Sequence, residues 1–135
     1  MPRHIIGFDA GGTAIKAAIY DERGDERAVA SVTLAPLHPA PGRLERDPEA
    51  MWAAICETCR KVLVQVPPSS IVAVGLTGYG NGLYLVDKDG APLHNGILSP
   101  DQRAQGEVER WRAEGAEEAW SRSPTIGCGP ASRFP

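Results

Sequence analysis

The stretch HIIGFDAGGTAIKAAIYD, residues 4–21, decides the fold. Its first apolar run, 5–8, is typical of a buried strand and leads through an acidic residue into a glycine pair. A second apolar run, 17–20, follows after a few residues. The spacing therefore predicts an antiparallel hairpin that is closed by the turn Gly11–Thr13.

The turn of this hairpin has the composition of a phosphate site. Gly11 and Gly12 let the backbone approach a ligand, so that N–H groups converge on an anion, and Thr13 adds a hydroxyl donor. Asp9, at the strand end, is placed to hold a hydrated Mg²⁺ that bridges polyphosphate oxygens, and Lys16 adds a positive charge. A surface hairpin with an incidental aspartate is the alternative, and the hairpin by itself leaves both interpretations open.

The residues after the hairpin predict an α/β fold. A third strand completes an antiparallel meander over residues 1–36. Asp47-Pro48 has the pattern of a helix start, and apolar residues at helical spacing predict a helix over 47–66. The nearly continuous apolar run 71–76 is typical of a strand that is buried on both faces and reached through a helical crossover.

The last third of the chain combines a glycine-rich loop with a helix. The loop, residues 75–82, follows the apolar strand, and ligands of α/β proteins bind at the carboxyl ends of such strands. A further strand and a helix at 102–114 follow, and Asp101 is a suitable cap for that helix. We therefore expect one domain, with strands and pocket loop at 71–103 and a helix and tail at 104–135.

Composition excludes several classes of protein. A chain of 135 residues fits one domain, and 42% hydrophobic with 23% charged residues is ordinary globular usage. The net charge of −3 and the scattered basic residues argue against a nucleic-acid partner. Apolar runs stay far short of the ~20 residues that span a bilayer, and residues 1–4 enter the first strand without a secretory signal. The sequence thus predicts a cytoplasmic protein that binds no membrane.

Three stretches resemble the FGGY carbohydrate kinases of the actin, Hsp70 and sugar kinase superfamily. DAGGTAIKAAIYD (9–21) is similar to their first phosphate motif, and LERDPEAMW (44–52) is similar to the stretch where Asp-Pro precedes a helix with tryptophan. Residues 78–103 repeat the family's order of glycine loop, acidic turn and Asp-x-Arg. The resemblance, nearest to kinases of xylulose, L-xylulose and erythritol, implies an incomplete actin-like (ribonuclease H-like) domain, whose mixed sheet has an antiparallel N-terminal meander and flanking helices.

The resemblance also implies a function and a set of site residues. The family phosphorylates a sugar or polyol hydroxyl with ATP and Mg²⁺, so by match Asn81, Asp101 and Arg103 border the sugar, with a helix cap as the alternative for Asp101. Two departures touch this pocket: residues 79–81 are Tyr-Gly-Asn where many members have Gln-Met-His, and 99–101 are Ser-Pro-Asp where many have Trp-x-Asp. The identity of the sugar therefore stays open.

The resemblance places the general base of the reaction beyond Pro135, together with the adenosine pocket. The 135-residue chain alone is therefore expected to contain no catalytic residue and to phosphorylate nothing. Two alternatives remain open, a phosphate- or sugar-binding fragment without turnover and an interaction module that shares only the fold. Core faces left bare in such a fragment favour self-association, so a homo-oligomer is the expected assembly.

Overall fold

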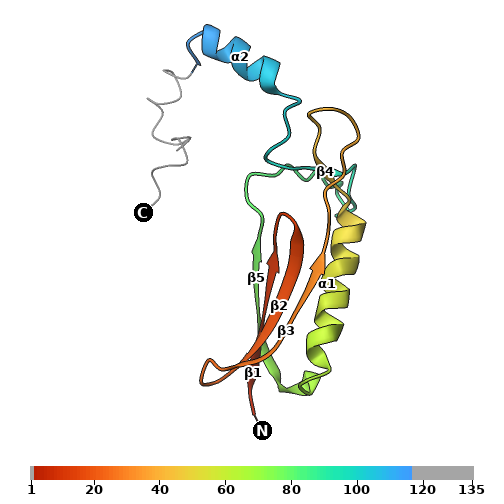
Figure 1. The fold of residues 1–135 in the computed structure, drawn as a ribbon, viewed down its shortest axis with the longest axis vertical. Coiled ribbons are helices and arrows are strands. Elements are labelled where there is room, and N and C mark those ends of the chain that lie inside the picture. Colours follow the sequence, from red (N-terminus) through yellow and green to blue (C-terminus); the bar gives the residue numbers. More distant parts are fainter. Residues whose placement is uncertain (1, 117–135) are drawn as a thin grey trace. The chain divides into compact units, whose positions relative to one another are not determined.

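The structure, a computed structural model, describes residues 2–116, which belong to two compact units, 1–101 and 102–135, each described by itself. A four-stranded sheet in the first unit has the order β3–β2–β1–β5, with β1 antiparallel to β2 and parallel to β5 (Figure 1). The elements are β1 (His4–Ala10), β2 (Ala14–Asp21), β3 (Glu26–Thr33), β4 (Glu45–Arg46), α1 (Pro48–Leu63), the 3-10 turn η1 (Pro68–Ser70), β5 (Ile71–Gly78), β6 (Gly96–Ile97) and α2 (Gln105–Ala113).

Side chains of the β1–β2–β3 meander alternate between two faces. In β1, Ile6 and Phe8 are buried whereas Ile5 and Asp9 are exposed, because successive side chains of a strand point to opposite faces. α1 packs over the face that carries Ile6 and Phe8 (Figure 1). The opposite face of the meander is left open in the first unit, and Asp9 lies on it.

The start of α1 follows the pattern in the sequence. Asp47 accepts a hydrogen bond from the Glu49 backbone N–H through Oδ1 at 2.8 Å, and Pro48 occupies the first turn, where its missing N–H leaves no gap in the helix. The helix ends at Leu63, three residues before the predicted limit. Its buried residues Ala54, Thr58 and Val62 face the sheet.

β5 is an edge strand, and the prediction that it is buried on both faces is wrong for this chain. Its side chains Val72, Val74 and Leu76 are 51%, 61% and 77% exposed. The reason is that α1 packs mainly over β3 and β2, so it leaves β5, at the edge of the sheet, largely uncovered on the face of these side chains. A groove of about 420 Å³ lies between β5 and α1, and its lining includes Phe8 and Trp52.

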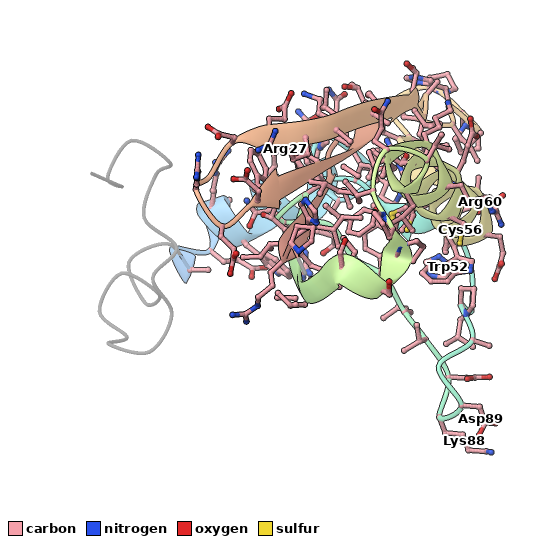
Figure 2. All side chains as sticks on the ribbon, turned by 90° about the horizontal axis from the view of Figure 1, so that it is seen from below. Arg27, Trp52, Cys56, Arg60, Lys88 and Asp89 are labelled. Atoms are coloured by element: carbon pink, nitrogen blue, oxygen red, sulfur yellow. The ribbon has the colours of Figure 1, made fainter. Side chains whose placement is uncertain are left out.

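A small two-stranded ribbon, β4 with β6, and a hairpin in which Val86 bridges to Pro92 complete the first unit. β4 pairs with β6, joining segments about fifty residues apart, with Glu45 opposite Ile97. The strand predicted after the glycine loop is reduced to isolated bridges, one of which joins Leu83 to Ile97. Figure 2 shows Lys88 and Asp89 at the tip of the hairpin, projecting away from α1.

The second unit contributes one described helix, α2. It begins at Gln105 rather than at the predicted residue 102, and its N-cap is Ala104, which has no capping side chain. The predicted tail beyond residue 116 lies outside the described residues. Within residues 2–116, no helix is both long and apolar enough to cross a bilayer.

Candidate functional site

The turn between β1 and β2 is tight and needs glycine. The Gly11 N–H donates to the Ala14 carbonyl at 3.0 Å, and a Cβ on Gly11 would lie 3.0 Å from that same oxygen. A side chain there would force a shift of the backbone. The Leu34 N–H donates to the Thr13 carbonyl at 2.9 Å, which anchors the turn to the segment after β3. Gly11, Gly12 and Thr13 thus form a compact turn at the carboxyl end of β1.

Asp9 and Lys16 lie side by side on the open face of the sheet, one step below this turn. The register pairs Asp9 with Lys16 across the β1–β2 ladder and with Thr77 across the β1–β5 ladder, while Lys16 is paired with Ser31. Paired residues share a face of the sheet, so four polar side chains cross all four strands in one row. The sequence did not predict this row, because only the register between the strands brings these four residues opposite one another.

A hollow of about 300 Å³ lies beside Asp9 and Lys16 on this face and extends over the meander to Tyr20, Glu26 and Val29. Asp9 and Lys16 line it together with Gly7 and Ala18, whose small size leaves room beside the two charges. Within residues 2–116, neither Asp9 nor Lys16 takes part in an ion pair. An exposed carboxylate and an exposed ammonium are therefore both available to a ligand at the end of β1.

Tyr79 links the glycine turn Gly11–Thr13 to the segment before α2. Its N–H donates to the Ala10 carbonyl at 2.9 Å, which extends the β1–β5 pairing by one residue. Its ring lies against Gly12, where an added Cβ would be 3.1 Å from Cε2. Its hydroxyl shares a hydrogen bond with the Ser99 hydroxyl. Tyr79, although 38% exposed, is thus held against the turn by its backbone and by its hydroxyl.

Arg46 reaches the same turn from β4 and is a residue that sequence reasoning missed. Its Nη2 donates to the Gly12 carbonyl, and the side chain is 2% exposed. Nothing in the sequence signals this burial, since Arg46 stands between Glu45 and Asp47 and reads as part of a solvated charged segment. The burial follows from the pairing of β4 with β6.

The three predicted substrate residues have different settings. Asn81 is exposed in the loop after β5 and adopts φ 61°, a left-handed conformation that asparagine tolerates better than most residues. Asp101 is half-buried, and its Oδ2 accepts a hydrogen bond from the Leu44 N–H at 2.6 Å. The helix-cap alternative for Asp101 is wrong, because α2 begins three residues beyond its expected start with Ala104 as N-cap. Arg103 belongs to the second unit, so its place beside the other two stays a prediction.

Residues 4–132 match the N-terminal domain of the FGGY family of carbohydrate kinases. The chain is 39% identical over 120 residues to L-xylulose/3-keto-L-gulonate kinase of Escherichia coli (strain K12), which covers 87% of this chain and 24% of that protein. It is 37% identical over 113 residues to a probable L-xylulose kinase of Haemophilus influenzae, covering 82% of this chain and 23% of that protein.

Solved structures agree with this match. The xylulose kinase of Rhodospirillum rubrum superposes with a TM-score of 0.78 at 30% identity, covering 87% of this chain and 25% of that one. The gluconate kinase of Lactobacillus acidophilus gives a TM-score of 0.83 at 25% identity over 90% and 25% of the two chains. These likenesses confirm the predicted fold class, and the chain spans about a quarter of the length of the curated relatives it matches. The chain belongs to the FGGY family of carbohydrate kinases and corresponds to the N-terminal domain of that family.

Proposed function

We propose that this chain is the phosphate-binding front part of an ATP-dependent kinase that phosphorylates a hydroxyl of a sugar or polyol. The observation that carries the proposal is the pairing of Asp9 with Lys16 beside the glycine turn at the end of β1. L-Xylulose is the first substrate to test, because two of the similar relatives are named as kinases of that sugar. ATP use accords with the cytoplasmic location that the sequence favours.

In this proposal the turn holds the phosphates of ATP. Gly11 and Gly12 bring the backbone close to the anion, Thr13 offers its hydroxyl, and Lys16 contributes a positive charge. Asp9 is the anionic anchor for magnesium. Within residues 2–116 no group of three or more metal-binding side chains occurs, and a single carboxylate suits magnesium, which retains waters and binds substrate phosphates. When bound, the ion neutralises charge on the transferred phosphoryl group.

Asn81, Asp101 and Arg103 are proposed to border the sugar. The hydrogen bond between Tyr79 and Ser99 supports this placement, because it joins the loop after β5, which holds Asn81, to the segment that holds Asp101. The Asp101 carboxylate already accepts one backbone N–H, and a carboxylate has lone pairs for further donors, so it can also hold a sugar hydroxyl.

The general base is expected in the part of a full-length enzyme that follows the region matched here. A chain that supplies one phosphate turn and one wall of a sugar pocket cannot hold both reactants in line. The 135-residue chain by itself is then a binding fragment. The groove between β5 and α1 gives that fragment an apolar face for self-association, and Trp52 and Cys56 of α1 line it together with Val74 and Leu76 of β5.

A chimera tests the proposal, with residues 4–132 replacing the matching part of the E. coli kinase. Turnover of L-xylulose with Mg·ATP is measured as ADP release. Asp9→Asn should lower kcat by roughly 100-fold or more, because it removes the anionic anchor of the metal. Asp25→Asn, an exposed carboxylate in the turn after β2, is the matched control and should leave kcat unchanged.

Two outcomes would contradict the proposal. Unchanged turnover in the Asp9→Asn chimera would exclude Asp9 as the metal anchor. Sugar-dependent ADP release by the purified 135-residue chain, lost on Asp9→Asn, would show that the base lies within this chain.

A further inference from the structure

Arg46 is almost completely buried although it carries a charge. The side chain is 2% exposed, and its Nη2 donates to the Gly12 carbonyl. Its Nε and Nη1 are buried and have no hydrogen-bond partner among the described residues. Its two acidic neighbours make other contacts: Asp47 caps α1, and Glu45 accepts a hydrogen bond from the Asn95 side chain at 3.1 Å.

Such a residue is a poor choice for packing alone. A guanidinium stays protonated in proteins, so Arg46 keeps its charge in the interior. Burying a charge or leaving a buried donor unpaired destabilises a fold, and an apolar side chain of similar volume often replaces a buried ion without loss. The position of Arg46 therefore calls for a partner that is not part of the described chain.

We infer that Arg46 is a positioning residue for the polyphosphate of a nucleotide, an inference that rests on the proposed function. Its hydrogen bond fixes the Gly12 peptide in the middle of the phosphate turn, while the Tyr79 ring packs against the same residue. Its charge attracts an anion on that turn through the protein interior, where electrostatic interactions are stronger than in water. A bound polyphosphate then compensates the buried charge.

Two variants separate this role from a structural one. Arg46→Met removes the charge and keeps the length of the side chain, and Arg46→Lys keeps a charge. Urea unfolding of the 135-residue chain should show Arg46→Met to be as stable as the wild type or more stable, since a buried cation with unpaired donors is lost. Arg43→Met, an exposed basic residue three positions earlier, is the matched control.

Kinetics of the same variants in the chimera decide the inference. We expect Arg46→Met to raise the KM for Mg·ATP about 10- to 100-fold, the loss typical of a charged hydrogen-bonding group. The KM for L-xylulose should change less than about twofold, and Arg46→Lys should restore most of the Mg·ATP affinity. Arg43→Met should change neither value.

The outcomes are distinguishable. A wild-type chimera without turnover overturns the proposed function and this inference with it. An active chimera whose Arg46→Met variant keeps its KM for Mg·ATP overturns the inference alone. A parallel rise in both KM values, with a drop in unfolding free energy, also overturns it, because that pattern identifies Arg46 as a purely structural residue.

Discussion

Gly12→Ala is the most direct test of how the glycine turn Gly11–Thr13 is packed. Gly12 has no positive φ, so the backbone accepts alanine and the ring of Tyr79 decides the effect. The added Cβ would lie 3.1 Å from Cε2 and 3.2 Å from Cδ2 of that ring. The ring cannot swing away freely, because its residue is tied to Ala10 through the backbone and to Ser99 through the hydroxyl.

The expected cost follows from two opposing effects. Overpacking of this kind destabilises by about 1–3 kcal/mol, and replacing glycine returns about 0.4–1 kcal/mol by restricting the unfolded chain. The net loss of unfolding free energy is about 1.3 kcal/mol at the midpoint of these two ranges. For a domain of this size that corresponds to a fall in Tm of about 5 °C, which thermal unfolding followed by circular dichroism resolves.

A double-mutant cycle isolates the contact. In a Tyr79→Phe background the ring remains but loses its hydrogen bond to Ser99, so Gly12→Ala should keep only part of its cost, whereas in a Tyr79→Ala background the cost should vanish. Gly7→Ala, at a site where a Cβ meets no atom within 4 Å, is the control and should show only the gain of about 0.4–1 kcal/mol that comes from restricting the unfolded chain. An equal cost of Gly12→Ala with and without the ring would refute the reasoning.

The other predictions concern charge and assembly. The hydrogen bond from the Arg27 guanidinium lowers the pKa of Asp21 to about 2. This pair therefore stabilises the fold above the ordinary carboxyl pKa, and the stability is lost as the pH falls toward 2. Asp21→Asn should flatten that part of a stability-versus-pH curve measured by urea unfolding, and an unchanged slope would contradict the assignment. Val74→Lys should suppress self-association in sedimentation velocity, because it places a charge on the exposed apolar side of β5. Val64→Lys, at an 85% exposed position just after α1, is the control; equal self-association of both variants would place the contact elsewhere.

The hairpin and α1 were predictable because their signals are local. Glycines close the turn after Asp9, and Asp47 with Pro48 opens the helix, so each boundary depends on residues within a few positions. That residues 71–76 form a strand, the core of β5, was predictable for the same reason. Its burial was not, because burial depends on which elements cover the two faces of the strand, and an apolar composition gives no information on that.

The candidate site was predictable only in part. Asp9 and the turn follow from sequence, but the row that joins Asp9 to Thr77 depends on strand register. A helix cap was the alternative for Asp101 because a predicted helix follows it directly in the sequence. The N–H that its carboxylate binds belongs to Leu44, which lies 57 residues earlier. Arg46 was missed because its contact with Gly12 spans 34 residues and leaves no periodic trace.

The order of the elements in the sheet bears on how the chain folds during synthesis. β1, β2 and β3 are consecutive in sequence, α1 follows them after only the two-residue strand β4, and α1 packs on the three strands. Contacts between near neighbours in sequence form fastest, because little loop entropy is lost in making them. This portion can therefore assemble on the ribosome once residue 66 has emerged, before β5 is available. The glycine turn would then be shaped first, whereas β4 would gain its strand partner β6, and the loop after β5 its bond to Ser99, only later.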